Sequence, residues 1–497
     1  MDTEHWWGSP LLNRWPSDAV WASGSRDVSY GELRERVAQL VNVFGIAGIG
    51  PGSTVVLRLL PSLTLLWALF ALWSRGAQVI LVDPRLTREQ VGRLVEFCQP
   101  QHHLSSGGAN SAIVPFHSEC EVVIEPRRKG LPAQTEHCLV QLTSGTTGKP
   151  RVVARTAESL LDEIDRFGGI PDMPRRGERL LLLSSLVHPF GLVGGVLHAM
   201  RAGVGLVFGQ SYRPDEILRT LSTSAAEAVF GTPWHFSLLN RAEQVPELPG
   251  FRLAVSSGEI LPPRLSDQFE RRFGVRIGQA YGTTEVGVIA ADLAGNWPPP
   301  SVGRPAPGVD IQLHDGELWV RTAQTPYLRN LLDAGADATP SRYADGWLNT
   351  HDRCDFDPAT GVLRLHGRGD STVSVGIGEM HLSQIEAKLR THAEVAEVVV
   401  VAEPALELHI GTAGAVSEAE LARWCSDHIG LHISPDDVYL VPEIPRTHNG
   451  KLVRSREMLY AAYASRSRFR RWHAARRRAR TASPESTERT SPSGLEE

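Results

Sequence analysis

The sequence has few cysteines, few lysines and no long apolar run. Its five cysteines, at positions 98, 120, 138, 354 and 425, lie far apart, and no CxxC pair occurs. This spacing disfavours a zinc site and a disulfide framework, and it favours a reducing, cytoplasmic location. The most apolar stretch, Leu63 to Trp73, is shorter than the roughly 20 residues that span a bilayer. We therefore expect no membrane span and predict a buried helix there.

Lysine is scarce enough to mark the positions where it occurs. Only four lysines (Lys129, Lys149, Lys388 and Lys451) occur among 51 basic residues, so a lysine inside a motif carries unusual weight. The net charge of -5 disfavours a polyanion-binding protein, and no nucleic-acid partner is expected. The N-terminal segment lacks the charged-then-apolar pattern of a secretory leader.

Short apolar segments alternate with segments of helical periodicity along most of the chain. The predicted helices are 30–44, 63–73, 157–167, 192–201 and 214–223. The predicted strands are 54–60, 77–82, 179–186, 204–208 and 227–230. This alternation is typical of an α/β fold with parallel βαβ sheets. Near 303–321 the pattern changes to short strands with a turn at Asp315-Gly316, which predicts a β-rich appendage.

The segment 367–370, Gly-Arg-Gly-Asp, predicts a boundary between two domains of unequal size. Residues 1–368 are expected to form the large N-terminal domain, and residues 369–463 a small mobile α+β domain. The small domain is predicted to contain helices at 383–391 and 416–428 and a strand at 397–402. Residues 464–497 begin with a basic segment, which has eight arginines between positions 466 and 480, and end in a low-complexity tail expected to be disordered.

The segment Leu142–Val153, LTSGTTGKPRVV, has the composition of a polyphosphate-binding loop. Four hydroxyl side chains surround two glycines, and one of the rare lysines follows. Glycines let backbone N–H groups approach an anion, hydroxyls add donors and lysine adds positive charge. The loop is not a Walker A motif, because Thr143 stands in place of its first glycine and Pro150 follows Lys149.

This loop resembles the signature loop of the adenylate-forming superfamily, which includes acyl- and aryl-CoA synthetases, luciferases and nonribosomal adenylation domains. Four other segments resemble motifs of that superfamily in the same order, and the resemblance covers about residues 28–456. These segments are Gln279–Glu285 (QAYGTTE), Asp345–Asp352 (DGWLNTHD), Gly367–Asp370 (GRGD) and Pro445–Lys451 (PRTHNGK). The resemblance implies that the protein joins a carboxylic acid to AMP, releases pyrophosphate and passes the acyl group to a thiol.

The resemblance also implies a role for each motif residue. The phosphates of ATP would be held by Thr143, Ser144, Gly145, Thr146, Thr147, Gly148 and Lys149. The adenine would lie between Tyr281, with Gly282 and Thr283 beside it, and the segment Ser257, Gly258 and Glu259. Thr284 would contact the α-phosphate and Glu285 would bind Mg²⁺, a cation that prefers oxygen ligands. Asp352 would bind the ribose hydroxyls, Arg368 the ribose or phosphate, and Lys451 both the substrate carboxylate and the α-phosphate. Asp370 would be the hinge about which the small domain rotates between the two half-reactions.

Several positions depart from the superfamily's pattern. His351 replaces a glycine, Arg151 replaces a lysine, and Thr322 stands where a glycine is usual. After the hinge, Ser374 and Ile377 replace a common lysine and a common glycine. These last two changes lie in the segment that meets the thiol in CoA-using members, so the acceptor is predicted less firmly than adenylation.

The acid substrate is predicted from the segment Val187–Gly191. Adenylating enzymes for α-amino acids carry an Asp that pairs with the α-ammonium, and Pro189 takes that place here, so an α-amino acid is disfavoured. His188 and Phe190 are expected to flank the acyl group, with His188 also a candidate catalytic residue. The other predicted pocket residues are Trp234, His235, Ser256, Ala280 and Val286. The bulk of Trp234 favours a short or flat acid.

Three alternatives to a CoA ligase remain open from the sequence. In the first, the acceptor is the phosphopantetheine arm of a carrier protein instead of CoA. The arginine-rich segment could attract an acidic carrier protein or the phosphates of CoA. A catalytically degenerate nucleotide-binding scaffold is disfavoured because Lys149, Glu285, Asp352 and Lys451 are all present. An oxidative enzyme of luciferase type is the third alternative.

Overall fold

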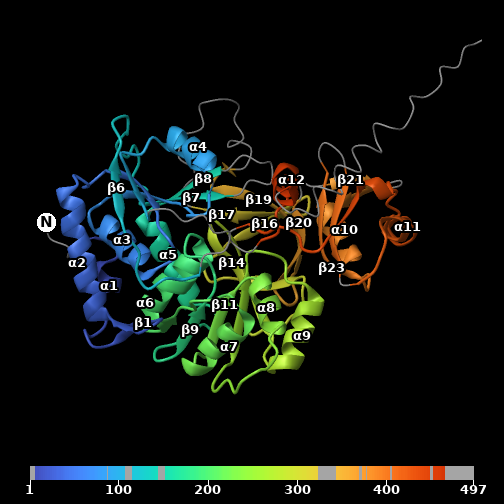
Figure 1. Cartoon of the computed structure of the whole chain (residues 1–497), viewed down its shortest axis with the longest axis horizontal. Coiled ribbons are helices and arrows are strands. Elements are labelled where there is room, and N and C mark those ends of the chain that lie inside the picture. Colours follow the sequence, from blue (N-terminus) through green and yellow to red (C-terminus); the bar gives the residue numbers. More distant parts are fainter. Residues whose placement is uncertain are drawn as a thin grey trace, which may run out of the picture.

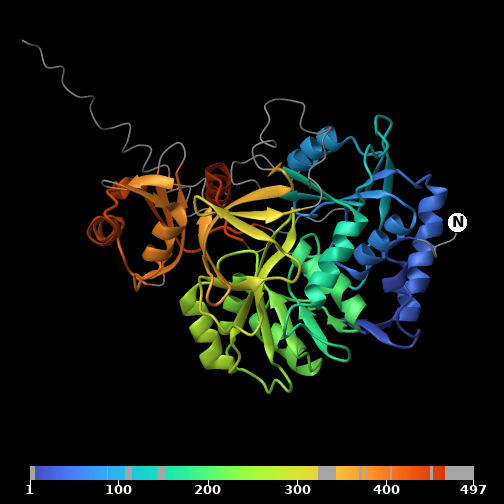
Figure 2. The ribbon, with the colours of Figure 1, turned by 180° about the vertical axis from the view of Figure 1, so that it is seen from behind.

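The computed structural model describes residues 6–86, 88–106, 115–143, 151–322, 343–368, 372–375, 378–402, 406–412, 414–447 and 451–464. These residues form two sheets with helices between and outside them, and a smaller C-terminal unit to one side (Figures 1 and 2). The described residues thus cover most of the region 28–456 in which the sequence motifs lie.

The first sheet has six strands, in the order β6-β5-β3-β4-β7-β8. Its four central strands are parallel, while β6 and β8 are antiparallel to their neighbours. The strands are β3 (Thr54–Arg58), β4 (Gln78–Leu81), β5 (His102–Ser105), β6 (Val123–Pro126), β7 (Leu139–Thr143) and β8 (Arg151–Arg155). Strand β7 leads directly into the predicted phosphate loop.

The second sheet has fourteen strands, in the order β16-β17-β19-β20-β15-β14-β13-β12-β11-β9-β10-β1-β2, with β18 beside β19. In one part of the sheet, the neighbouring strands β13, β12, β11, β9, β10 and β1 pair parallel. On the other side of β13, the pairs β13–β14 and β14–β15 are antiparallel. The first nine strands are β1 (Val20–Ser23), β2 (Asp27–Ser29), β9 (Arg179–Leu182), β10 (Gly205–Val207), β11 (Ala228–Gly231), β12 (Leu253–Ser257), β13 (Ile277–Thr283), β14 (Gly287–Asp292) and β15 (Ser301–Pro305). The remaining strands are β16 (Ile311–His314), β17 (Glu317–Arg321), β18 (Tyr343–Ala344), β19 (Trp347–Asp357) and β20 (Val362–Arg368). These five strands form most of the predicted β-rich appendage.

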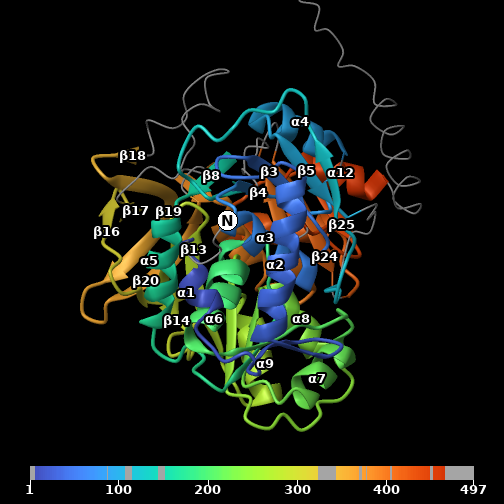
Figure 3. The same cartoon turned by 90° about the vertical axis from the view of Figure 1, so that its left-hand side faces the viewer.

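The helices of the large part form three layers around the two sheets (Figure 3). Helix α4 (Arg88–Cys98) covers the outer face of the six-stranded sheet. The middle layer contains α1 (Ser9–Leu12), α2 (Tyr30–Ile46), α3 (Leu63–Ser74), α5 (Ala157–Gly168), a π-helix (Phe190–Leu197) and α6 (His198–Ala202). The outer face of the large sheet is covered by α7 (Pro214–Thr223), α8 (Pro233–Asn240) and α9 (Pro263–Phe273).

Local sequence explains where the long helices of the middle layer begin and what they bury. The hydroxyl of Ser29 accepts from the N–H of Glu32 at 3.2 Å, and Ser62 caps α3 in the same way through Leu65 at 3.1 Å. Every residue from Leu63 to Trp73 is buried, which confirms the buried helix predicted from this apolar stretch. Among the described residues, no helix is long and apolar enough to cross a membrane.

The predicted helix at 192–201 differs from the structure in type and start. A π-helix runs from Phe190 and passes into α6 at His198. Glycines allow the backbone to pack closely here: a Cβ on Gly191 would lie 2.2 Å from the carbonyl oxygen of Ser185. Propensity and periodicity do not distinguish such a widened turn from an α-helix, because both keep the same apolar residues buried.

The C-terminal unit is a small α+β assembly. A hairpin of β21 (Thr372–Val375) and β22 (Gly378–His381) precedes a three-stranded sheet of β23 (Val395–Val401), β24 (Glu407–Thr412) and β25 (Val438–Val441). Its helices are α10 (Leu382–Leu389), α11 (Glu418–Ile429), a 3₁₀ turn (Pro435–Asp437) and α12 (Arg456–Ala464). The large and small parts agree with the predicted fold class.

Candidate active site

The ends of β13 and β19 bring two predicted site residues into direct contact. The hydroxyl of Tyr281 donates a hydrogen bond to Oδ2 of Asp352 at 2.6 Å, although the residues are 71 positions apart in the sequence. Burial, followed by the Asp352 carboxylate, raises the pKa of Tyr281 well above its ordinary value, so the phenol stays protonated. This bond brings the tyrosine and aspartate motifs together at one site, the candidate active site.

Asp352 has a second site residue as its cross-strand neighbour. In the antiparallel pair of β19 and β20, Asp352 lies opposite Arg368, two positions before the predicted hinge residue Asp370. The preceding residue, His351, has a φ of 59°, a left-handed conformation that glycine adopts at little cost. His351 therefore keeps the backbone conformation that a glycine would favour, despite its side chain.

Two arginines flank Lys451 in the sequence, and each forms an ion pair within the small domain. Arg446 forms an ion pair with Glu397, and Arg454 donates to both carboxylate oxygens of Glu386, with an Nη2–Oε2 distance of 2.9 Å. Glu386 is buried, and although burial opposes it, Arg454 lowers the pKa of this carboxylate. Both flanks of the lysine loop are thereby fixed to the small domain.

The lysine loop also contacts the large domain, at the end of β12. The backbone N–H of Leu452 donates to Oε1 of Glu259 at 2.9 Å. A Cβ added to Gly258 would lie 3.2 Å from Cε of Lys451, so the lysine side chain packs against the glycine backbone, where φ is 92°. Glu259 was expected beside the adenine, and here it binds the backbone of the lysine loop.

The charge of Lys451 reflects a balance between burial and neighbouring carboxylates. Burial lowers the pKa of this amine, while Glu259 and Asp352 raise it and Arg454 lowers it further. The two carboxylates come from β12's end and from β19, on either side of the lysine. They stabilise the protonated amine that an anionic substrate would require.

Helix α5 supports the segment that follows Thr284 and Glu285. Glu163 is buried, forms an ion pair with Arg155 at 3.0 Å and accepts from the N–H of Val288 at 3.2 Å. Arg166 donates to the carbonyl oxygen of Val286 at 3.2 Å. Sequence reasoning missed all three residues; the only available signal was a charged residue beside the apolar stripe of a predicted helix.

Two phenylalanines form an aromatic wall near the lysine loop. The rings of Phe190 and Phe230 stack with centroids 5.0 Å apart and planes 17° apart. Phe230 is buried at the end of β11, and the next residue, Gly231, pairs with Ser256 of β12, two positions before Gly258. Ala280 belongs to the same core cluster. The wall therefore lies one strand away from the glycine that Lys451 contacts.

Gln141 ties this wall to the strand that leads into the phosphate loop. Its Nε2 donates to the carbonyl oxygen of Val187 at 2.7 Å, which fixes the backbone just before His188 and Phe190. Gln141 is buried in β7, two residues before Thr143. No motif marked this residue, because its partner is 46 positions away.

Some predicted pocket residues face elsewhere in the structure. Nδ1 of the buried His235 lies 2.9 Å from the hydroxyl of Thr232 and closes the cap of α8, and burial lowers the pKa of this imidazole to about 3. Ser256 follows the strand alternation of Ala254, whose side chain packs toward α8 and α9. Val286 packs in the cluster between β14 and the appendage, and Trp234 contacts Tyr212 at a centroid distance of 5.5 Å. We therefore leave His235, Ser256 and Val286 out of the acyl pocket proposed below.

Of the remaining predicted site residues, some lie at the end of β13, and the others lie outside the described residues. Thr283 lies in β13, and its hydroxyl is buried without a hydrogen-bond partner among the described residues. Thr284 and Glu285 lie in the turn between β13 and β14. Residues 144–150 of the phosphate loop, Asp370 at the hinge, Ile377 and the segment 465–497 lie outside the described residues, as do the side chains of Thr143 and Ser374.

Comparison with known proteins decides the family. The sequence profile described as "AMP-binding enzyme" matches residues 11–325, and the profile "AMP-binding enzyme C-terminal domain" matches residues 384–451. The chain belongs to the AMP-binding enzyme family. It is therefore an adenylate-forming enzyme that binds ATP, as its motifs predict.

The curated relatives of this AMP-binding enzyme include ligases for aromatic acids. Anthranilate–CoA ligase of Pseudomonas aeruginosa is 25% identical over 451 residues, which cover 82% of this chain and 86% of the relative. 2-Succinylbenzoate–CoA ligase of Escherichia coli is 26% identical, covering 87% of this chain and 92% of the relative. p-Hydroxybenzoic acid–AMP ligase FadD22 of Mycobacterium marinum is 26% identical, and the match covers 86% of this chain but 65% of that longer protein.

A solved structure shares the fold of this AMP-binding enzyme over almost the whole chain. The anthranilate CoA ligase AuaEII, in complex with anthranoyl-AMP, superposes with a TM-score of 0.75 at 19% identity and covers 97% of this chain and 100% of that one. This likeness confirms the predicted fold of a large α/β part with a small C-terminal domain.

Proposed function

We propose that this enzyme activates an aromatic carboxylic acid with ATP and transfers the aryl group to a thiol, most often that of CoA. The observation that carries the choice of acid is the stack of Phe190 on Phe230, 5.0 Å between centroids, beside the strand whose end contacts Lys451. Stacked aromatic side chains present a flat apolar surface on which an aromatic ring packs well. The partly exposed Phe190 supplies that surface.

Two further observations support an aromatic acid. Pro189 leaves no carboxylate at the position that would pair with an α-ammonium group. The curated relatives described above include enzymes named for anthranilate, p-hydroxybenzoate and 2-succinylbenzoate. Each of these acids carries a flat ring, and the stacked rings of Phe190 and Phe230 suit the same class of acid.

In the proposed adenylation step, a carboxylate oxygen of the acid attacks the α-phosphorus of ATP and the bond to pyrophosphate breaks. Lys451 would donate to the carboxylate and to the α-phosphate, which aligns the two anions and stabilises the negative charge that develops. Asp352 would hold the ribose, with Tyr281 fixing its carboxylate through the 2.6 Å hydrogen bond. Thr284 would contact the α-phosphate, and His188 would flank the acid.

Magnesium is expected with the nucleotide, where it would neutralise the charge of the phosphates. Glu285 is the residue proposed to hold it, since a carboxylate oxygen is a suitable ligand for a hard cation. Among the described residues, no cluster of three or more His, Cys, Asp or Glu side chains is close enough to hold a metal. A single carboxylate is in keeping with an ion that is bound mainly by phosphates and water.

A carrier protein is the second candidate acceptor. Ser374 and Ile377 depart from the pattern of CoA-using members after the hinge, and one relative is named as an AMP ligase. The arginine-rich segment 466–480 would attract either an acidic carrier protein or the phosphates of CoA. The proposed preference for CoA rests on the two relatives named as CoA ligases.

The acceptor is tested by supplying ATP, Mg²⁺, a benzoate derivative and either CoA or a phosphopantetheinylated carrier protein, with product detection by mass spectrometry. The account predicts aryl-CoA and AMP in the first reaction at a rate well above that of carrier loading. Loading of the carrier alone would contradict the choice of CoA while leaving adenylation intact. Formation of neither thioester, together with no aryl-AMP, would contradict the proposed function itself.

A further inference from the structure

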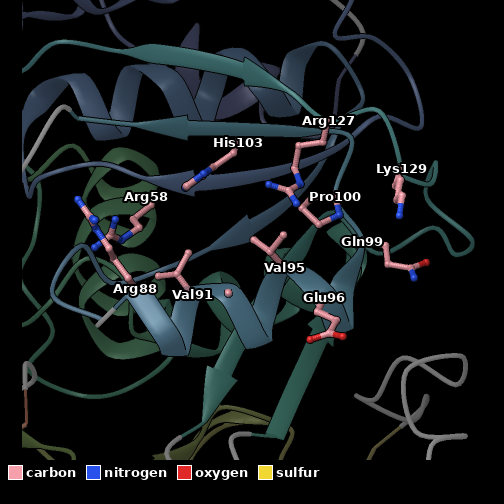
Figure 4. Close-up of a pocket in the computed structure, with 11 residues that line it drawn as sticks. Arg58, Arg88, Val91, Val95, Glu96, Gln99, Pro100, His103, Arg127 and Lys129 are labelled. Carbon is pink, nitrogen blue, oxygen red and sulfur yellow. The ribbon is translucent and has the colours of Figure 1, made fainter.

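A cavity of about 500 Å³ lies between helix α4 and the strands β5 and β6, on the outer face of the six-stranded sheet (Figure 4). Basic side chains from four separate segments line it: Arg58, Arg88, Arg127, Lys129 and His103. Val91, Val95 and Pro100 form apolar parts of its lining. None of the residues around Lys451 contributes to this cavity.

The basic groups at its rim have no carboxylate partners. In the part of the chain that the structure describes, Arg88, Arg127 and Lys129 form no ion pair. Glu96 also lines the cavity, but Figure 4 shows its carboxylate directed away from Arg127 and His103. The side chains of the cavity therefore leave an excess of positive charge.

The inner part of the cavity contains a guanidinium that is only partly satisfied. Nη2 of Arg58 donates to the carbonyl oxygens of Pro84 at 2.6 Å and Leu86 at 2.9 Å, which fixes the guanidinium. Its Nε is buried with no acceptor among the described residues, and Nε2 of the neighbouring His103 imidazole has no hydrogen-bond partner among them. A buried charged donor without an acceptor is costly, and an anion beside this guanidinium would supply compensating charge.

The pKa of His103 reflects both the cations of the cavity and one carboxylate. Burial lowers the pKa of this imidazole, Glu125 at 3.5 Å from Nδ1 raises it, and Arg58 and Arg127 lower it. Arg58 has one carboxylate in range, Asp83, but Arg85 already binds both oxygens of that group at 2.9 Å. Of these two carboxylates, one therefore faces His103 and the other is bound by Arg85.

We propose that this cavity is a second binding site, outside the candidate active site, for a small compound that carries a phosphate or diphosphate group. Arg58 and Arg127 would bind the phosphate oxygens, and Val91 and Val95 would contact the less polar remainder of the ligand. The volume lies within the range of roughly 300–1,000 Å³ that is usual for small-molecule sites. A guanidinium offers several N–H donors in a fixed plane, which suits phosphate geometry.

The test is calorimetric titration of the full chain with inorganic pyrophosphate at low ionic strength. Arg127→Gln is the informative variant because Arg127 is exposed, so its loss does not threaten folding. Arg128→Gln is the matched control: it removes the same charge from the adjacent exposed residue, which does not line the cavity. Pyrophosphate is also the product expected at the candidate active site, so two binding events are expected for the wild type.

In Arg127→Gln, one of the two events should weaken about tenfold, the loss expected for a charge-assisted hydrogen bond. Arg128→Gln should keep both events, and both variants should keep the adenylation rate. Equal binding by the two variants, or a single event in the wild type that neither variant changes, would overturn the proposal. Titration with inorganic phosphate separates recognition of one phosphate group from recognition of a diphosphate.

Discussion

The candidate active site around Lys451 and the cavity beside α4 both contain basic side chains, but they differ in how the charge is balanced. In the candidate active site, Lys451 lies near Glu259 and Asp352, and its neighbour Arg454 is paired with the buried Glu386. In the cavity, the exposed Arg88, Arg127 and Lys129 form no ion pair among the described residues. The candidate active site therefore fixes one cation at a defined position, whereas the cavity presents a diffuse excess of positive charge to solutes.

The difference in charge balance suits the two regions to different tasks: one positions a reacting group, and the other attracts anions. A paired cation inside a protein is oriented by its partners and can align a reacting group. Unpaired cations at a surface cavity repel one another and favour the binding of anions. Four predictions follow the contrast, beginning with the substitution of the fixed lysine.

Lys451→Ala should reduce the rate of aryl-AMP formation by about 10²–10³-fold, because it removes a preorganised donor to the developing negative charge. The measurement is single-turnover formation of aryl-AMP at saturating ATP. The free energy of unfolding should change little, since the amine forms no ion pair with the described residues of the small domain. A decrease of less than threefold in this rate would mean that Lys451 is not part of the adenylation site.

Glu386→Ala should destabilise the small domain by about 3–5 kcal/mol, because it leaves Arg454 and Arg390 without the buried carboxylate that binds them. Chemical denaturation followed by circular dichroism measures the loss. Asp427→Ala, an exposed acid on α11 of the same domain, serves as the control and should change stability by less than about 0.5 kcal/mol. Similar effects of both variants would contradict the anchoring role of Glu386.

Glu259→Gln should slow adenylation about tenfold and shift its pH dependence. The amide can still accept from Leu452, but it no longer supplies the negative charge that raises the pKa of Lys451 against burial. Lys451 is active when protonated, so the rate falls as pH rises through its pKa, and this fall should begin at a lower pH in the variant. Glu247→Gln, an exposed acid of the same domain, should leave the pH profile unchanged.

Arg127→Gln should have the smallest effect and the opposite sign on stability. Removing one unpaired cation from the cavity should raise the free energy of unfolding by about 0.2–0.5 kcal/mol in phosphate-free buffer, since it reduces repulsion. Thermal unfolding of Arg127→Gln measures this change. The same measurement on Arg128→Gln gives the baseline for the loss of an exposed arginine outside the cavity. Destabilisation by more than about 1 kcal/mol would mean that Arg127 makes a structural contact.

The sequence predicted the architecture because its α/β signals are local and repeated. The helix at 63–73 and the turn at Asp315-Gly316 depend on neighbouring residues, and both occur in the structure. Tyr281, Asp352 and Lys451 were singled out from motifs, since each lies in a short string with a recognisable pattern, and the structure places the three near one another. Helix types and strand ends were predicted less well where packing against distant residues decides them.

The supporting residues could not be predicted because their partners lie far away in the chain. Glu259 and Leu452 are 193 positions apart, and Glu163 reaches Val288 across 125 positions. No periodicity or composition relates such pairs, so the contact of Glu259 with the lysine loop was not predicted and Glu163 was not noticed. His235 was expected in the pocket, and in the structure its ring is hydrogen-bonded to Thr232 at the cap of α8.

The central claim, that the site around Lys451 adenylates a flat aromatic acid, is tested most directly by ATP–pyrophosphate exchange. The wild type would be measured with benzoate derivatives, medium-chain fatty acids and α-amino acids, with Lys451→Ala alongside. The account predicts exchange that depends on an aromatic acid, is much weaker with the other two classes and collapses in the variant. Exchange that requires a fatty acid or an α-amino acid, or exchange that survives in Lys451→Ala, would contradict it.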